Sequence, residues 1–248
     1  GTLAILDWMK ENLEKIDHCL VGEPTSKEYL GDTIKVGRRG SLTAKLTAYG
    51  LQGHVAYPDK ATNPLPALMK LLLKLEKKIL DNGNQFFDPS SLAITSIDTG
   101  NPSNNVIPQM SEATINIRFN DIHSDISLTT WLRKTIQKVM NETGVSIVLE
   151  VKVSARPFIC HPDDFTKLVS QVIKTETKIF PSNSTSGGTS DARFIQEYCP
   201  VVEFGLVGKT MHKTNENVEV KQIIELSAIY QNILKSYFKV AKAVEKKL

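Results

Sequence analysis

The chain contains few cysteines, and their small number excludes a small disulfide-rich protein and a zinc finger. Cys19, Cys160 and Cys199 are the three cysteines among 248 residues. Their wide spacing forms neither a disulfide framework nor a zinc-finger pattern. Cysteines without a disulfide framework are typical of a reducing compartment, so the sequence predicts a cytoplasmic protein.

Long apolar runs and an excess of one charge are also lacking. No apolar run approaches the roughly 20 residues of a membrane span, and no signal peptide opens the chain. A formal net charge of +3, without a run of Lys and Arg, does not favour nucleic acid as a ligand. We therefore expect neither a membrane nor a nucleic acid among the partners.

An initial methionine is lacking as well. The chain begins Gly1-Thr2-Leu3, directly within a helical pattern, so we expect it to be a fragment of a longer protein. What is present is ordinary for a globular protein, with 41% hydrophobic and 23% charged residues. At 248 residues the chain is long enough for one large or two ordinary domains.

Residues 41–153 carry the clearest secondary-structure pattern. Apolar and polar residues alternate over 42–49, which predicts a half-buried strand. Further strands are predicted at 91–98, 111–119 and 145–153, and amphipathic helices at 64–80 and 126–140. The order β-α-β-β-α-β is that of a ferredoxin-like domain. Two helices would cover one face of its sheet and leave the other face and the edges free for a partner.

The flanking segments follow a different order. Helices are predicted at 2–14, from 165 onwards and at 220–245, and buried strands at 18–21 and 200–206. The sequence thus predicts a two-domain protein, in which an α+β insert at 41–153 interrupts an α/β domain made of residues 1–40 and 154–248.

His54 lies in the most informative stretch, Gly50-Leu-Gln-Gly-His-Val-Ala-Tyr-Pro58. A histidine between a glycine-rich turn and a proline is presented to solvent, which suits a group that donates a hydrogen bond to a substrate oxygen. An incidental surface histidine is the alternative interpretation.

Glu23 and His212 each follow a predicted strand, where α/β folds place catalytic and ligand groups. A solvated turn acid and an ordinary surface histidine are the alternatives. A zinc centre needs three or four ligands, and local chemistry identifies only these two. His161 and Asp163 have the His-x-Asp spacing of a metal site, but they directly precede a predicted helix. We therefore interpret Asp163 or Asp164 as a helix N-cap.

Four further segments could bind carboxylates. Arg38 lies between glycines in Gly37-Arg-Arg-Gly-Ser41, and a guanidinium matches a carboxylate bidentately. Arg118 lies on a strand face opposite its apolar residues, and Asn105 offers an amide in a turn. The segment that contains Gly188 and Thr189 could present backbone N–H groups to an anion. Solvated turns, an outward charge and helix capping remain open as local explanations.

Six strings in order along the chain carry a resemblance to a known family. They are Cys19-Leu-Val-Gly-Glu-Pro-Thr-Ser26, Gly37-Arg-Arg-Gly-Ser41, Gly53-His-Val-Ala-Tyr-Pro58, Ser103-Asn-Asn-Val-Ile-Pro108, Thr185-Ser-Gly-Gly-Thr-Ser-Asp191 and Met211-His-Lys-Thr-Asn-Glu216. Together they closely resemble the co-catalytic dizinc amidohydrolases, the family that holds acetylornithine deacetylase and aminoacylase. The resemblance implies hydrolysis of the amide of N-succinyl-LL-2,6-diaminopimelate to succinate and LL-diaminopimelate, on the route to lysine.

The resemblance also implies a role for each candidate residue. Glu23 would be a carboxylate ligand of one zinc (or cobalt) ion and His212 the histidine ligand of the other, with two ions per complete subunit. His54 would reach across a homodimer, formed through the insert, to polarise the scissile carbonyl in the partner's active site. The carboxylates of the substrate would be held by Arg38, Asn105, Arg118, Gly188 and Thr189. The insert would be the dimerisation or lid domain, and the flanks would be an incomplete catalytic domain.

The chain departs from the family pattern in one respect. The family's His-x-Asp motif, its bridging aspartate and its paired glutamates, one of them the general base, are not found in a matching context. We therefore expect this chain alone neither to assemble the two-metal site nor to turn over substrate. Two rival interpretations remain: a related deacylase or peptidase, such as acetylornithine deacetylase, and a non-enzymatic dimeric binding module.

Overall fold

The computed structural model describes residues 1–245, and the side chains of residues 1–239. The described chain forms two compact units, one from residues 39–157 and the other from the segments on either side. Each unit has its own buried core, and each is described by itself below.

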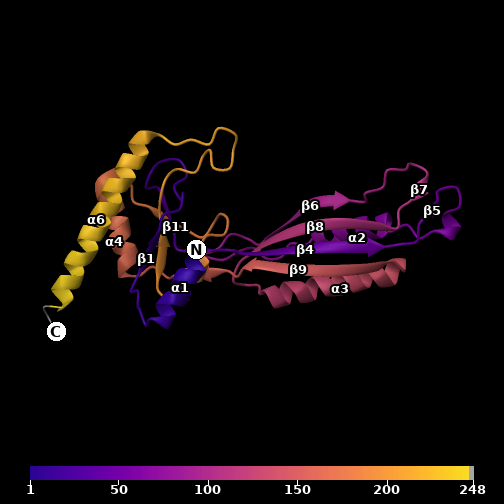
Figure 1. Ribbon diagram of the computed structural model, residues 1–248, viewed down its shortest axis with the longest axis horizontal. Helices are drawn as coiled ribbons and strands as arrows, with labels where there is room; N and C mark the ends of the chain where they lie inside the picture. The colour runs from indigo at the N-terminus through magenta and orange to yellow at the C-terminus, as the bar shows by residue number, and fades with distance from the viewer. Residues whose placement is uncertain (246–248) are drawn as a thin grey trace. The chain divides into compact units, whose positions relative to one another are not determined.

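The unit of residues 39–157 is built on a four-stranded antiparallel sheet in the order β6-β8-β4-β9 (Figure 1). Its strands are β4 (Gly40–Tyr49), β6 (Ser91–Asp98), β8 (Met110–Phe119) and β9 (Ser146–Ala155). The helices α2 (Leu65–Glu76) and α3 (Asp125–Thr143) pack on this sheet and on each other. The predicted β-α-β-β-α-β ferredoxin-like arrangement is therefore confirmed.

Period-two alternation explains why one face of this sheet is buried. Leu42, Ala44 and Leu46 on β4 are fully buried, as are Ile115 and Ile117 on β8, and they form one core with the apolar faces of the two helices. The opposite face carries the polar partners of these residues. Three short elements complete the unit: β5 (Gly53–His54), β7 (Val106–Ile107) and the 3₁₀ turn η1 (Pro58–Lys60).

The second unit contains a mixed four-stranded sheet in the order β1-β12-β2-β11. Its strands are β1 (Cys19–Val21), β2 (Thr33–Lys35), β11 (Ser182–Ser184) and β12 (Val201–Glu203). The strands β3 (Gly37–Arg38) and β10 (Phe158–Ile159) form a separate antiparallel pair. The helices are α1 (Thr2–Glu11), α4 (Asp164–Thr177), α5 (Ala192–Ile195) and α6 (Val220–Glu245). Of these, α4 and α6 lie side by side (Figure 1).

Several predicted boundaries were wrong by a few residues. The helix predicted at 2–14 ends at Glu11, because Leu13 adopts a left-handed backbone conformation with φ of 57°. The helix predicted at 64–80 spans Leu65–Glu76, and the strand predicted at 200–206 is limited to Val201–Glu203. By contrast, α3 is longer than predicted, because a capping box at Ser124 starts it and left-handed Gly144 ends it.

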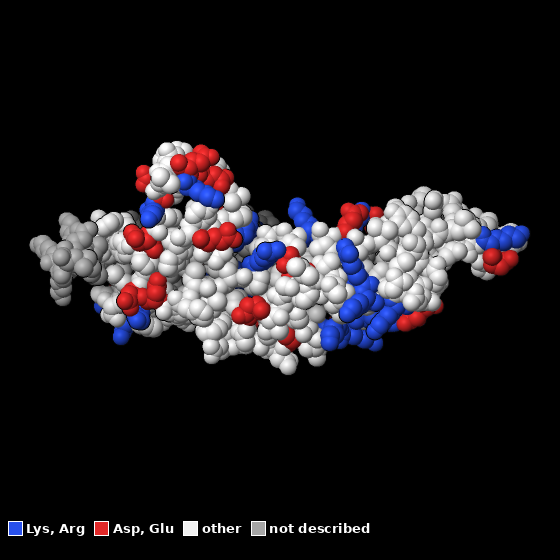
Figure 2. All heavy atoms as spheres, turned by 90° about the horizontal axis from the view of Figure 1, so that it is seen from below, with Lys and Arg blue, Asp and Glu red and all other residues white. Residues whose placement is uncertain are grey.

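Charges of both signs are spread over the surface. Figure 2 shows acidic and basic side chains on the face that it draws, with one gathering of Lys and Arg. On α3, three exposed basic side chains, Arg133, Lys134 and Lys138, lie along the helix. Among the helices of the described chain, none is long and apolar enough to cross a membrane.

Candidate functional site

A buried ion pair between Arg38 and Glu203 lies at the centre of the candidate site in the unit of residues 1–38 and 158–245. Arg38 ends the short strand β3, and Glu203 ends β12. Arg38 is 8% exposed and Glu203 1% exposed. The Arg38 Nε atom donates to both carboxylate oxygens, at 3.1 and 3.0 Å, and Nη2 also donates to Oε2. A charge buried this deeply needs a partner of opposite charge, and Arg38 and Glu203 are partners of each other.

Two further side chains extend this pair into a network. The Ser190 hydroxyl donates to Glu203 Oε1 at 2.6 Å, and Arg38 Nη1 donates to the carbonyl oxygen of Ser186 at 3.3 Å. Lys35 is buried on β2 and donates to the hydroxyls of Ser184 and Ser186, at 3.0 and 2.8 Å. Because Ser184, Lys35 and Glu203 are register partners across β11, β2 and β12, their side chains share one face of the sheet.

The loop that carries Gly188 and Thr189 runs past the Arg38 guanidinium. A Cβ atom added at Gly187 would lie 2.6 Å from Arg38 Nη1, and the φ of Gly187 is +103°. Only glycine combines this backbone conformation with so close an approach. Gly188 and Thr189 are exposed beside this contact, so the structure brings Arg38, Gly188 and Thr189 into one region, as the carboxylate hypothesis requires.

Glu23 lies two residues beyond β1, in a turn packed against Gly205. Burial raises the pKa of its carboxyl, and the nearby charges of Glu203 and Asp191 raise it further, while Arg38 opposes them. Glu23 lies near the buried network, because Val21, two residues before it, is the register partner of Glu203 across β1 and β12. Together with Met211 and Glu216, Glu23 also lines a cavity of about 350 Å³.

His212 lies in the loop that borders this cavity. It is exposed and has a φ of +61°, and the loop is held by hydrogen bonds between Thr210 and Asn217. Its neighbour Met211 lines the cavity that Glu23 also lines. Within the described part of the chain, no group of three or more His, Cys, Asp and Glu side chains is placed to hold a metal ion.

His54 and Asn105 come together in the unit of residues 39–157. His54 pairs with Val106 across β5 and β7, and the next backbone N–H, of Val55, donates to the carbonyl oxygen of Asn105 at 3.1 Å. The exposed His54 ring accepts a hydrogen bond at Nδ1 from the backbone N–H of Ala56, at 3.1 Å. A neutral ring that accepts at Nδ1 carries its proton on Nε2, so Nε2 is a donor.

Arg118 lies in the same unit, on β8. It is half-buried on the polar face of the sheet, next to Ser41 of β4 and Ser91 of β6, while its neighbours Ile117 and Phe119 are fully buried on the other face. This agrees with the predicted face. Among the described residues, none accepts a hydrogen bond from its guanidinium, so its donors are available to a ligand or to water.

Asp163 is a helix cap, as its position before a helix predicted. Its side chain accepts from the backbone N–H of Thr166 at 2.8 Å and begins α4. Burial alone would raise the pKa of Asp163, but hydrogen bonds from Thr166 and the nearby His18 lower it. His18 Nε2 lies 3.5 Å from the carboxylate. The His-x-Asp spacing at 161–163 therefore has a structural explanation.

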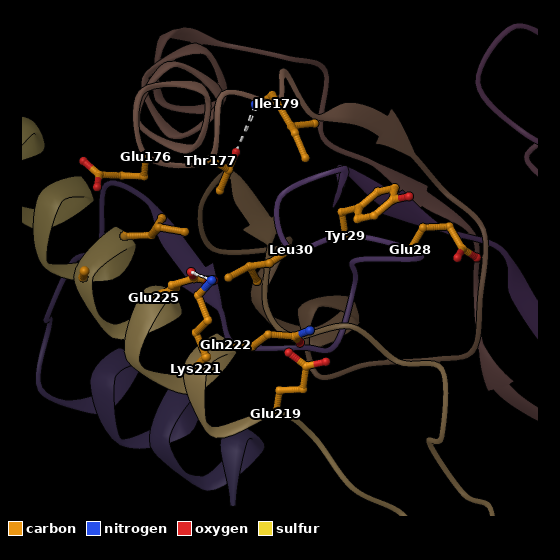
Figure 3. Close-up of a pocket in the computed structure, with 12 residues that line it drawn as sticks. Glu28, Tyr29, Leu30, Glu176, Thr177, Ile179, Glu219, Lys221, Gln222 and Glu225 are labelled. Carbon is orange, nitrogen blue, oxygen red and sulfur yellow. Dashed lines mark hydrogen bonds and ion pairs between the residues drawn. The ribbon is translucent and has the colours of Figure 1, made fainter.

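A second hollow of this unit, of about 540 Å³, contains none of the predicted site residues (Figure 3). Its lining comes from the end of α4, the beginning of α6 and the segment around Tyr29. Four glutamates line it, and three of them have a partner: Asn232 donates to Glu176, Lys221 pairs with Glu225, and Lys209 pairs with Glu28. Its size alone gives no reason to place the functional site there.

Glu203 is the main site residue that the sequence analysis missed. The pattern of Pro200-Val-Val-Glu-Phe-Gly-Leu206 predicts a strand and nothing more. A charged residue inside an apolar run is seldom fully buried without a partner, and that anomaly was the available signal. Lys35, between the apolar residues Ile34 and Val36, carried the same signal.

The sequence is similar to one family model and to a set of curated enzymes that share a name. Residues 36–144 match the peptidase dimerisation domain M20_dimer. The succinyl-diaminopimelate desuccinylase of Cereibacter sphaeroides strain KD131 is 55% identical over 238 residues, covering 96% of this chain and 63% of that protein. The enzymes of the same name from Roseobacter denitrificans and Ruegeria pomeroyi are 52% and 50% identical over the same length. The chain thus spans about 63% of the length of the curated relatives it matches.

Solved structures show the same fold at much lower sequence identity. A tripeptidase from Staphylococcus aureus is 17% identical with a TM-score of 0.76, covering 91% of this chain and 58% of that one. The dipeptidase Dug1p of Saccharomyces cerevisiae is 14% identical with a TM-score of 0.72, covering 96% and 63%. These likenesses establish the fold only.

Proposed function

We propose, since the chain belongs to the family of the succinyl-diaminopimelate desuccinylases, that the complete protein hydrolyses N-succinyl-LL-2,6-diaminopimelate. The products would be succinate and LL-2,6-diaminopimelate, in the biosynthesis of diaminopimelate and lysine. The observation that carries this proposal is the 55% identity to a desuccinylase over 96% of the chain. The candidate carboxylate site around Arg38 supports it, because the substrate carries several carboxylates.

Substrate carboxylates are assigned to Arg38, Gly188 and Thr189 in one unit and to Asn105 and Arg118 in the other. The Arg38 guanidinium carries five N–H donors, one on Nε and two on each of Nη1 and Nη2. Three of them are used: Nε–H and one Nη2–H by Glu203, and one Nη1–H by the Ser186 carbonyl oxygen. One N–H therefore remains on each terminal nitrogen. Two such donors match the two oxygens of a carboxylate.

His54 is proposed as the donor to the scissile carbonyl. Because Nδ1 accepts from Ala56, a neutral ring carries its proton on Nε2, and a donor of this kind stabilises negative charge that develops on a carbonyl oxygen. In this proposal His54 acts in the active site of a partner subunit, within a homodimer formed through the insert at 41–153. The match of residues 36–144 to a peptidase dimerisation domain supports the dimer.

Zinc or cobalt is proposed as the cofactor, with Glu23 and His212 as two of its ligands. The two donors, an oxygen and an imidazole nitrogen, are of types that zinc binds, but zinc needs three or four ligands. The described residues supply no group of three. The residues present therefore do not complete the site, and we propose that the missing ligands and the general base lie in the part of the complete protein that this chain does not span.

The two units are assigned different roles in this proposal. Residues 41–153 would form the dimerisation and lid domain, and residues 1–40 and 154–248 would belong to the catalytic domain. The cytoplasmic location remains a prediction from the cysteines.

The experiment that tests the function compares two substrates of the complete protein, loaded with zinc. We expect a much larger kcat/KM for N-succinyl-LL-2,6-diaminopimelate than for N-acetylornithine. A preference for the acetylated substrate would assign the protein to the related deacylases instead. Absence of turnover with both would favour the non-enzymatic binding module.

The metal proposal is tested on this chain by itself. After dialysis against trace zinc and then against buffer, we expect little zinc to remain bound, because two candidate ligands do not hold the ion tightly. One or two retained ions per chain would contradict this ligand assignment and direct attention back to His161 and Asp163.

A further inference from the structure

We propose that Glu203 is a positioning residue that holds Arg38 in the orientation needed to bind a substrate carboxylate, and that Ser190 in turn orients Glu203. This inference rests on the proposed function of Arg38. None of the comparisons assigns a role to Glu203 or Ser190.

The geometry of the guanidinium supports this role. Glu203 contacts the side of the guanidinium formed by Nε and Nη2, and Ser186 accepts from Nη1. Each of these interactions uses one N–H of its nitrogen, so Nη1 and Nη2 each keep one N–H that no described residue accepts from. Fixing one edge of a planar guanidinium fixes the direction of the opposite edge, so Glu203 determines where a bound carboxylate must lie.

Burial makes this arrangement rigid. Glu203 is 1% exposed and Arg38 8% exposed, so water does not compete for the hydrogen bonds between them. Ser190 is 5% exposed, and its hydroxyl lies 2.6 Å from Glu203 Oε1. Charge-assisted hydrogen bonds in such surroundings are strong and directional.

The same network connects Arg38 to the loop that carries Gly188 and Thr189. Ser186 and Ser190 lie on either side of these two residues, and they contact Arg38 and Glu203 respectively. The buried pair therefore fixes both ends of this short loop. A change at Ser190 disturbs the loop and the guanidinium together.

Ser190→Ala is the variant that tests the inference. Glu203→Gln would leave Arg38 charged and buried without its ion pair, which can prevent folding, whereas Ser190→Ala removes one hydrogen bond and keeps the pair. In the zinc-loaded complete protein we expect Ser190→Ala to raise KM for the succinylated substrate about tenfold, with kcat less affected. Ser170→Ala is the matched control, because Ser170 is also a buried serine of this unit, 4% exposed.

A double-mutant cycle separates positioning from general damage. In an Arg38→Lys background, Ser190→Ala should change KM by less than about twofold, because the group that it positions has been replaced. An equal rise of KM in both backgrounds, or no rise in either, would overturn the inference.

A second measurement distinguishes this inference from the proposed function. In ¹⁵N–¹H spectra of this chain, the Arg38 Nε–H signal, assigned by its loss in Arg38→Lys, should exchange slowly with water and exchange faster in Ser190→Ala. Unchanged exchange would overturn the positioning role. A wild-type protein that fails to turn over the succinylated substrate, but shows this acceleration, would overturn the proposed function alone.

Discussion

Gly187 combines two features that a single methyl group would disturb. Its φ is +103°, and an added Cβ would lie 2.6 Å from Arg38 Nη1. The adjacent Gly188 has neither feature, since nothing lies within 4 Å of the position that a Cβ atom would take there and its φ is not in that region. The two neighbours therefore form a natural pair of variant and control.

We predict that Gly187→Ala lowers the free energy of unfolding by about 1–3 kcal/mol, because alanine is strained at this φ and displaces the guanidinium. Gly188→Ala should change it by much less. The measurement is urea unfolding followed by fluorescence of Trp8, which lies in the same unit, in a Trp131→Phe background. Equal effects of the two substitutions would contradict the structure of this loop.

At the scale of single residues, the sequence pointed to exposed candidates and to the buried Arg38, but not to the buried partner of Arg38. His54 and Asn105 are both predicted from turn chemistry, and the structure places them on neighbouring segments. Glu203 is not predicted, because its environment is set by Arg38 and Ser190. Arg38 is 165 positions away in the sequence, and Ser190 is 13 positions away. Local patterns contain no information on such pairing, so a buried charge could be noticed but its partner could not be named.

At the scale of elements, periodicity predicted the long helices and strands well. The predicted strand 91–98 is β6 without change, and the predicted helix 220–245 is α6. The strands β3 and β10 were not predicted, because each has two residues and too few positions to show alternation. Their pairing depends on contacts between residues more than 100 positions apart.

The segment between α2 and β6 is organised around one largely buried carboxylate. Asp81 accepts hydrogen bonds from the backbone N–H groups of Gly83 and Ser90 and from the side chain of Asn120, at 2.7–3.2 Å, and His123 Nε2 lies 3.1 Å away. Burial alone would raise the pKa of Asp81, but these hydrogen bonds outweigh it and lower the pKa.

A lowered folded-state pKa means that Asp81 stabilises this segment at higher pH. The contribution is fully present above the unfolded value of about 4 and is lost as pH falls through the lower folded value. We predict that the free energy of local opening, from hydrogen exchange at Gly83 and Ser90, is constant above about pH 4 and decreases below it. In Asp81→Asn the value should be lower throughout and independent of pH.

Asp59→Asn is the control for this prediction, because Asp59 is an exposed carboxylate of the same unit. It should leave the exchange at Gly83 and Ser90 as in the wild type. A pH dependence that persists in Asp81→Asn would show that another group holds the segment.

At the scale of the whole molecule, the ordered motifs predicted more than any local pattern. The resemblance drawn from six short strings agrees with the succinyl-diaminopimelate desuccinylases, which are 50–55% identical over 96% of the chain. The fold class is confirmed by the ferredoxin-like sheet and by the solved structures. A complete metal site could not be derived from the chain, because zinc needs more ligands than the two candidates, Glu23 and His212.

The proposed homodimer predicts that two inactive variants restore activity when they are mixed. If His54 acts in the partner's active site while Glu23 acts in its own, His54→Ala and Glu23→Ala inactivate different halves of the same composite site. Mixing the two inactive complete proteins should then restore activity. In each mixed dimer, the site that retains its own Glu23 also receives an intact His54 from the partner.

Because mixed dimers form half of a random mixture and contain one intact site of two, we expect about a quarter of the wild-type activity after subunit exchange. Two separately purified variants assayed without exchange are the control and should stay inactive. If exchange occurs, as followed by mass spectrometry of differently tagged chains, and activity does not return, His54 serves its own subunit. That result would not affect the proposal that Arg38 binds a substrate carboxylate. It would mean that the active site needs no residue from a partner subunit, so that activity would not depend on dimerisation.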